Sequence, residues 1–300
     1  MIYYFVAERH AGSMRDFLET AGRPLVGRLA VLPYEVFLSG RVDLPEREGA
    51  FIFSSLEIVR RMPPKAQAAL QALHDRLVET RGPGRVLNDP ARSLLRYDML
   101  RLLHDRGINA FNVYRTDGAV EGLRYPAIVR HEAKRLFEHL TLAQNPQQYG
   151  ALLNGVTWQQ GTRSRFITIE FCDTADADGI YRKYGAFVVG DRIVRRHMFV
   201  SRNWLVRDVD LVDPPYLAEE MAYLNAEPNP HDQVLLECAR LAGVSYGRFD
   251  YSLLDGRPQI WEVNTNAGFV SPQAASERQP CLEKFVATFT DAMTALDPEG

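Results

Sequence analysis

Short runs of apolar residues alternate with longer amphipathic stretches along the chain of 300 residues. Apolar residues at every second position predict strands, and a spacing of three to four positions predicts helices. The prolines Pro63 and Pro64 mark the start of one predicted helix, and Gly82 marks its end. The order of the elements predicts an α+β protein built from several small units. The predicted strands are 2–7, 29–37, 50–54, 111–114, 127–130, 165–171, 184–189, 192–199, 246–254 and 259–264, and the predicted helices are 14–21, 64–81, 91–104, 213–224, 231–241 and 282–295.

The last two predicted strands are joined by Asp255-Gly256, a pair typical of hairpin turns. Register in such a pair follows the hydrophobic pattern, because a shift by one residue turns every side chain to the other face. A strict two-residue turn would set Phe249 opposite Glu262. A shift by one sets Asp250 opposite Glu262 and gathers the aromatic side chains on the other face. We therefore expect a three-residue or bulged loop.

This register brings three oxygen-bearing side chains together. Glu262 and Asn264 are two residues apart and share a face of an extended strand, with Asp250 opposite Glu262. Two facing carboxylates repel each other unless a positive charge lies between them, and either Arg248 or a divalent cation could supply it. Oxygen ligands without His or Cys suit Mg²⁺, which is usually completed by water and substrate phosphates. From spacing alone, a structural ion pair and a magnesium site are equally good interpretations.

The composition narrows the classes of protein. Hydrophobic residues make up 46% and charged residues 24% of the chain, as in ordinary globular proteins. The formal net charge of −3 gives no indication of nucleic-acid binding. The first residues lack a signal-peptide pattern, and no apolar run is long enough to cross a bilayer. The three cysteines are far apart and form no CxxC pair, so we expect reduced thiols and a cytoplasmic protein.

Two motifs point to other chemistry but lack its context. GVSYG, from Gly243 to Gly247, matches a nucleophile elbow, but it follows a predicted helix and precedes a strand, the reverse of an elbow. HEAKR begins like a zinc-binding HExxH motif, but Arg135 stands where the second histidine is required. The chain also has no GxxxxGK[ST] phosphate-binding loop. A serine hydrolase, a zinc protease and a Walker-type ATPase are therefore not expected.

The segment GRFDYSLLDGRPQIWEVNTNAGF, residues 247–269, resembles the C-terminal metal-binding end of the ATP-grasp superfamily. The segments RVLNDPARSLLRYDMLRLLHDRGINAFNVYR, YPAIVRHE, ITIEFCDT and YRKYGAFVVGDRIVRRHMFV resemble earlier parts of that family in the same order. The resemblance is closest to the ribosomal-protein-modifying and glutathione-synthetase-like branches. It implies the α+β ATP-grasp fold, with two subdomains at 91–165 and 166–300 that enclose ATP, after a small N-terminal α/β domain at 1–90.

The resemblance implies a metal site and a phosphate site. Asp250, Glu262 and Asn264 would hold Mg²⁺, with two ions expected, and these ions would bridge the phosphates of ATP. Arg96 and Arg130 would replace two phosphate-binding lysines, and arginine keeps the charge with a different geometry. From the residues alone, Arg130 could instead form a surface salt bridge, and Arg96 could lie on a solvated helix face.

Further residues follow from the same resemblance. Segment 169–172 would meet the adenine of ATP through backbone donors and acceptors, although Glu170 could be a plain edge-strand charge. Lys183 would contact ribose or phosphate, or lie exposed on its strand. Arg196 and Arg248 would act on the reacting groups. In segment 169–172, the residues that the resemblance implies for nucleotide binding are Glu170, Phe171 and Cys172.

The sequence departs from the family in two further places. Relatives have a flexible glycine-rich loop after the second cation, whereas segment 131–150 contains no glycine before Gly150. Relatives also often carry arginine where Gly185 stands. If the hairpin turns at Gly190-Asp191, Gly185 lies opposite Arg196, and Arg196 could fill that space.

The resemblance implies ATP-dependent ligation of a carboxylate to an amine through an acylphosphate. The substrates would be small molecules or peptides, and the protein would act by positioning and by neutralising charge. Two alternatives stay open: a small-molecule kinase on the same scaffold, and a non-catalytic nucleotide-binding relative. We expect no nucleic-acid or membrane partner, and the chain could form a homodimer.

Overall fold

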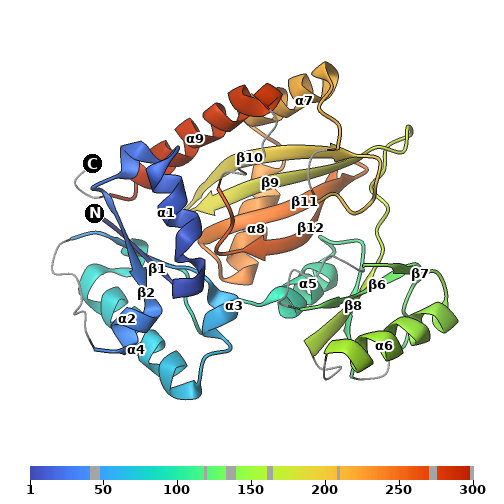
Figure 1. Cartoon of the computed structure of the whole chain (residues 1–300), viewed down its shortest axis with the longest axis horizontal. Coiled ribbons are helices and arrows are strands. Elements are labelled where there is room, and N and C mark those ends of the chain that lie inside the picture. Colours follow the sequence, from blue (N-terminus) through green and yellow to red (C-terminus); the bar gives the residue numbers. More distant parts are fainter. Residues whose placement is uncertain are drawn as a thin grey trace.

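The computed structural model describes residues 1–40, 48–117, 120–132, 140–160, 165–207, 210–269 and 276–297, and only the backbone of 156–160. In these residues the chain forms three four-stranded sheets with helices packed around them (Figure 1). This arrangement confirms the α+β class. Of the helices described, none combines the length and the apolar character needed to cross a membrane.

The first sheet has the order β2-β1-β3-β4, and its strands run parallel. The predicted strand 29–37 is too long, because β2 ends at Pro33, which has no N–H for the ladder. The chain then enters a short helix at the buried Tyr34, whose hydroxyl donates to the carbonyl of Ser54 at 2.8 Å. The elements are β1 (Ile2–Val6), η1 (Glu8–His10), α1 (Ala11–Glu19), η2 (Arg23–Leu25), β2 (Leu29–Pro33), α2 (Tyr34–Leu38), β3 (Ala50–Phe53), α3 (Leu56–Val59), α4 (Pro64–Arg81), η3 (Pro83–Arg85) and β4 (Val86–Leu87).

The second sheet is antiparallel and has the order β5-β8-β6-β7. Its last strand, β8, starts at Phe166, so the sheet runs past residue 165, the predicted limit of the second unit. The helix predicted at 91–104 starts only at Arg96, because the Asp89 side chain accepts from the N–H groups of Ala91 and Arg92 and forms a turn there. The elements are α5 (Arg96–Asp105), β5 (Val113–Arg115), β6 (Ala127–His131), β7 (Leu142–Ala143), α6 (Pro146–Gln160) and β8 (Phe166–Glu170).

The third sheet is the largest and has the antiparallel order β10-β9-β11-β12. Figure 1 shows α9 and α7 beside the β10 edge of this sheet and the second sheet on the side of its other edge, β12. The elements are β9 (Tyr181–Val189), β10 (Arg192–Ser201), α7 (Pro214–Asn225), α8 (Asp232–Ala242), β11 (Tyr246–Leu254), β12 (Arg257–Asn264), η5 (Ser276–Arg278) and α9 (Gln279–Thr294).

Both hairpins of the third sheet contain a β-bulge. The β9–β10 turn at Gly190-Asp191 is confirmed, since Val189 pairs with Arg192. The register then shifts at Arg196, so Gly185 lies opposite His197 and the expected pairing with Arg196 is wrong. The extra residue of a bulge moves every later pair by one position.

The β11–β12 hairpin reaches the expected pairing by a different route. Leu254 pairs with Arg257 across a two-residue turn, so the predicted longer loop is wrong. Asp255 and Gly256 have φ of 50° and 75°, which suits a type I′ turn. A bulge at Trp261 then restores the register, and Asp250 lies opposite Glu262 as predicted. The polar and aromatic pattern therefore determined the register where the side chains are buried, but not at the turn.

Two cores hold the third sheet in place. One face packs against α5 and α8. The other packs against α1, α9 and one face of the first sheet. In this second core Phe187 stacks on Phe269 with ring centroids 5.6 Å apart, and Tyr4 meets Tyr246 edge-on at 5.7 Å. The shared core fixes the first sheet against the third.

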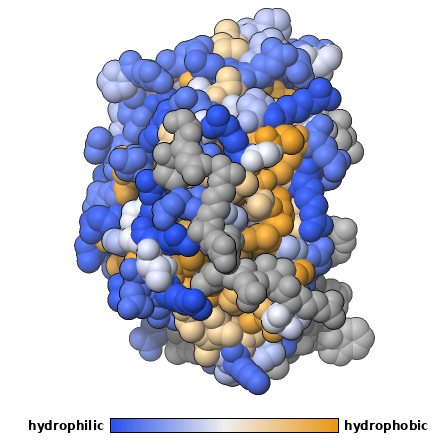
Figure 2. All heavy atoms as spheres, turned by 90° about the vertical axis from the view of Figure 1, so that its left-hand side faces the viewer, coloured by the Kyte–Doolittle hydropathy of each residue, from blue (hydrophilic) through white to orange (hydrophobic). Residues whose placement is uncertain are grey.

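The two ends of the described chain lie on one side of the molecule (Figure 1), and the ammonium group of Met1 pairs with the carboxylate of Asp297. Figure 2 shows this side, where a strip of apolar residues is bordered by polar ones. Among the described residues, Val26 is the large hydrophobic side chain that is strongly exposed, at 62%.

Candidate active site

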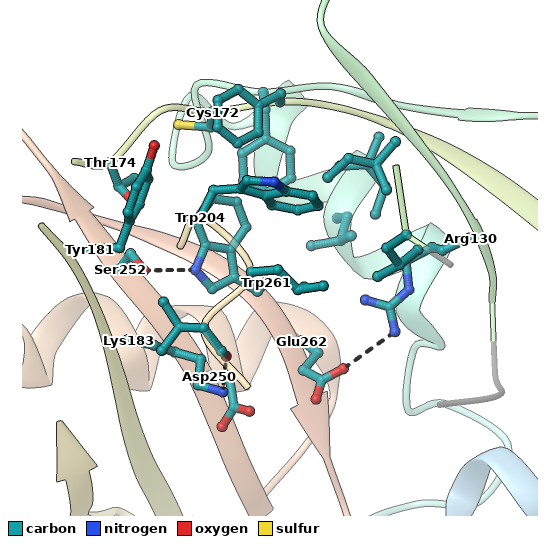
Figure 3. A pocket seen from close by; sticks show the side chains of 18 of the residues that line it. Arg130, Cys172, Thr174, Tyr181, Lys183, Trp204, Asp250, Ser252, Trp261 and Glu262 are labelled. Atoms are coloured by element: carbon teal, nitrogen blue, oxygen red, sulfur yellow. Dashed lines mark hydrogen bonds and ion pairs between the residues drawn. The ribbon is translucent and has the colours of Figure 1, made fainter. Parts of the chain in front are cut away.

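A cavity of about 250 Å³ lies between the second and third sheets. Most of its walls are apolar or aromatic, and its polar end is made by β9, β11 and β12 (Figure 3). Trp261, the bulged residue, lines it and stacks on Phe111 with centroids 4.9 Å apart. Trp261 therefore faces the cavity and not the aromatic face expected for it. The lining comprises Leu100, Phe111, Ile128, Arg130, Leu140, Ile169, Glu170, Phe171, Cys172, Thr174, Tyr181, Lys183, Trp204, Leu205, Val206, Arg207, Arg248, Asp250, Ser252, Trp261 and Glu262.

Two carboxylates face each other at the polar end. Asp250 is 5% exposed and receives two hydrogen bonds from Arg248, at 2.7 and 3.0 Å. Burial lowers the pKa of Arg248, but the charge of Asp250 outweighs it and the net pKa is raised. Asn264 lies opposite Arg248, and its side-chain oxygen accepts from the N–H of Asn266 at 3.0 Å. The predicted metal ligands are thus together on two neighbouring strands.

Three cations point at this end from different elements. Arg96 of α5 forms an ion pair with Glu262, and Arg130 of β6 lies 3.9 Å from the same carboxylate. Figure 3 shows Arg130 and Glu262 facing each other across the cavity. Lys183 of β9 donates to the carbonyl of Val206 at 2.6 Å. The alternative of a solvated Arg96 is wrong, because its side chain is only 16% exposed.

No family model matches the sequence, and no curated protein does. Solved structures match over nearly the whole chain. The D-alanine–D-alanine ligase from Bacillus anthracis complexed with ATP is 11% identical, with a TM-score of 0.50 and 97% of both chains covered. The ATP-grasp ligase PsnB complexed with a minimal precursor is 14% identical, with a TM-score of 0.54 and 98% of both chains covered. The D-cycloserine synthetase DcsG is 15% identical, with a TM-score of 0.52 and coverage of 98% of this chain and 100% of that one.

The chain has the ATP-grasp fold. At these identities the likeness shows the fold alone. In this ATP-grasp fold the cavity, the two carboxylates and the three cations occupy one region between the second and third sheets.

The end of β8, expected to meet adenine, differs from that expectation in one respect. Glu170 is 3% exposed, and its carboxylate accepts from Arg124 (2.5 and 2.9 Å), from the Asn112 N–H (2.9 Å) and from the Tyr114 hydroxyl (3.1 Å). The N–H groups of Glu170 and Phe171 donate to the carbonyls of Asn112 and Pro126. The Glu170 side chain therefore holds the end of β8 in place, and the N–H groups of Glu170 and Phe171 already have hydrogen-bond acceptors.

Arg196 is not among the residues that line the cavity. It is 8% exposed, and its guanidinium lies 4.9 Å from the centre of the Phe285 ring. Burial, followed by the charges of Arg248 and Arg278, lowers the pKa of Arg196 to about 9. The space at Gly185 is filled by His197, because a Cβ there would lie 2.4 Å from the imidazole Cε1.

Some cavity residues carried no readable sequence signal. Tyr181 and Thr174 lie in an ordinary strand and loop, and Ser252 accepts a hydrogen bond from the Trp261 indole at 2.9 Å. Trp204, which also lines the cavity, meets Phe171 edge-on at 5.7 Å. Residues 133–139 of the glycine-poor segment 131–150 lie outside the described residues.

A second polar cluster was also missed, at the carboxyl ends of β1 and β3. His10 Nδ1 lies 3.1 Å from the Ser55 hydroxyl and 3.8 Å from Glu57. Both contacts use one ring nitrogen, so this is not a nucleophile–base–acid chain. Thr265 donates to Glu57, and Asn266 donates to the carbonyl of His10, at 3.5 and 3.4 Å. Ser55 has φ of 52°, an uncommon conformation that occurs often at functional sites.

Proposed function

We propose that this protein is an ATP-dependent ligase that joins a carboxylate to an amine through an acylphosphate. The observation that carries the proposal is the pairing of Asp250 with Glu262, with Asn264 on the same strand, at the polar end of an apolar cavity. Apolar walls suit a purine, and a polar end with cations suits phosphates. The solved structures with this fold described above are ligases by their names, which supports the same class.

The donor set fits Mg²⁺. Among the described residues there is no group of three or more His, Cys, Asp and Glu side chains that could hold a metal. The candidate donor set consists instead of two carboxylates and one amide. Mg²⁺ commonly takes one or two carboxylates and keeps water and phosphate oxygens as its other ligands. Asp250, Glu262 and Asn264 would hold the ion, which would offset the charge of the phosphates when bound.

The chain's own cations would do the remaining work. Arg96 and Arg130 are paired with Glu262 and would be available to phosphate oxygens once a metal neutralises that carboxylate. Arg248, next to Asp250, would offset the charge that spreads over the transferred phosphoryl group. An oxygen of the acid attacks the γ-phosphorus and ADP leaves. The amine nitrogen then attacks the acyl carbon, and phosphate leaves with that oxygen.

The cluster at the first sheet suits the amine substrate. Glu57 could hold an ammonium group, and His10 could accept the proton that the amine loses. Hydrogen bonds through Thr265 and Asn266 join this cluster to the end of β12, next to Asn264. We infer that the amine approaches from this side, opposite the nucleotide.

The test is a screen for ADP release with Mg·ATP, pairs of acids and amines, and short peptides, followed by mass spectrometry of the products. A ligase gives ADP, phosphate and an amide. A kinase gives ADP and a phosphoester without phosphate, and a non-catalytic relative gives none of these while Mg·ATP still raises its melting temperature. Glu262→Gln should abolish product formation, and Glu283→Gln on the exposed face of α9 is the matched control. Unchanged turnover in Glu262→Gln would contradict the proposal.

A further inference from the structure

Three arginines converge on one face of the third sheet, next to the cavity. Arg196 comes from β10, Arg248 from β11 and Arg278 from the turn before α9. Arg196 and Arg278 are each 8% exposed. Figure 1 shows that α9 and α7 flank β10 here. The cluster is therefore buried beneath these helices.

Two of the three arginines have a carboxylate partner. Arg248 pairs with Asp250, and Arg278 pairs with Glu220 at 2.5 and 2.9 Å. Arg196 forms no ion pair with any carboxylate of the described chain, and its buried Nε has no hydrogen-bond partner there. Its described contact is the Phe285 ring. Among the described residues Arg196 is thus a buried cation without an ion-pair partner of its own, because the nearby carboxylates of Asp250 and Glu220 pair with Arg248 and Arg278.

The imidazole of His197, the next residue after Arg196, lies in the same excess of positive charge. His197 is 2% exposed, and neither of its ring nitrogens has a hydrogen-bond partner among the described residues. Burial lowers the pKa of His197 well below its ordinary value, and the charges of Arg196, Arg248, Lys183 and Arg278 lower it further. Four cations therefore surround this point.

A buried charge without an ion-pair partner is costly. The deficit also grows during the proposed reaction, because Asp250 would turn to the metal and leave Arg248. A bound ligand can supply this negative charge.

The position of Arg248 indicates which ligand. Arg248 lines the cavity, whereas Arg196 and Arg278 lie outside its lining, so Arg248 is the member of the cluster that faces the nucleotide side. The reacting carboxylate has to lie beside the transferred phosphoryl group, and therefore beside Arg248. A second acidic group on the same molecule would reach the Arg196 side.

We propose that Arg196, supported by Arg278, binds a second carboxylate of the acid substrate, so that the acid this protein activates is a dicarboxylate. This inference rests on the proposed ligase function. A guanidinium binds a carboxylate through two parallel N–H bonds, and such charge-assisted bonds are among the strongest in proteins. The same chemistry would bind a phosphate of ATP, and the experiment separates the two sources.

The test measures binding without turnover. Calorimetry with Mg·ADP present compares glutarate with pentanoate, which have equal chain length and differ by one carboxylate. The wild type should bind glutarate at least about tenfold more tightly, as one charge-assisted pair implies. Arg196→Met should remove this preference while leaving the affinity for Mg·ATP within about twofold, and Arg196→Lys should retain part of it. Arg192→Gln, on an exposed arginine of the same strand that pairs with Asp291, should behave as the wild type.

Three results would overturn the dicarboxylate site. The wild type could bind the two acids equally, Arg196→Met could keep the preference, or Arg196→Met could weaken Mg·ATP tenfold, which would make Arg196 a phosphate ligand. Without ligand, Arg196→Met should melt no lower than the wild type, because it removes an uncompensated charge and keeps an apolar side chain of similar length. If Arg196→Met fails to fold, the charge has a structural partner and the proposal fails, whatever Arg196→Lys does. A preference for glutarate without any ADP release would refute the ligase and leave the anion site in place.

Discussion

Gly185 lies on strand β9 inside the third sheet, opposite His197 of β10 and Asp250 of β11, and it tests the bulge at Arg196. A Cβ at this position would lie 2.4 Å from Cε1 and 2.8 Å from Nδ1 and Nε2 of His197. The imidazole is also stacked on the Phe199 ring, with ring centroids 3.9 Å apart. Since the ring cannot move away, Gly185→Ala should overpack the sheet and cost about 1–3 kcal/mol.

Scanning calorimetry should show this cost as a melting temperature lower by about 2–6 °C, since 1 kcal/mol moves a chain of this size by about 2 °C. In a His197→Ala background, Gly185→Ala should cost less than about 0.5 kcal/mol, because the clash is gone. Gly84→Ala is the matched control, since a Cβ there meets nothing within 4 Å. If Arg196→Ala relieved the strain and His197→Ala did not, the register without a bulge would be correct and ours would be wrong.

Four other variants or labels test separate parts of the structure. Burial alone raises the pKa of Glu170, but bonds from Arg124 hold it below its ordinary value. Arg124→Gln should therefore lower the melting temperature at pH 7, and this effect should shrink as the pH falls below the ordinary pKa of glutamate and through the lowered pKa of Glu170; an effect that grows as the pH falls would contradict this. Asn88→Ala removes bonds to the backbone of Phe53, Ser245 and Tyr246 and should cost about 3 kcal/mol or more by calorimetry, whereas a loss below 1 kcal/mol would be unexpected. Burial and Asp173 raise the pKa of Cys172 to about 11, so its alkylation by iodoacetamide should keep accelerating above pH 9 and slow when Mg·ATP is added, and a rate that levels off near pH 8 would refute the assignment. Glu57→Gln should raise the KM for the amine at least about tenfold with the KM for ATP unchanged, while an equal rise in both would place Glu57 elsewhere.

Much of the fold could be predicted because buried residues leave a periodic pattern. The helix at 64–81 and the turn at Gly190-Asp191 follow directly from prolines and glycines in the sequence. The pairing of Asp250 with Glu262 followed from which face is apolar. The bulges at Arg196 and Trp261 could not be predicted, because an extra residue in one strand leaves no mark in a pattern of alternation.

The candidate site was predictable where residues are close in sequence and unpredictable where contacts are distant. Arg96 and Glu262 meet across 166 positions, and no local pattern specifies that contact. The cluster of His10, Ser55 and Glu57 needs η1, after β1, and the β3–α3 connection to come together. The domain limits, the number of metal ions, a homodimer and a cytoplasmic location stay predictions.

The transfer of one oxygen atom tests the central claim most directly. The acid found in the screen is labelled with ¹⁸O in its carboxylate and converted with Mg·ATP and the amine, and the released phosphate is analysed by mass spectrometry. A ligase that works through an acylphosphate places one ¹⁸O atom in each phosphate, because the attacked phosphorus keeps the oxygen of the acid. Phosphate without ¹⁸O would contradict the mechanism proposed for this cavity.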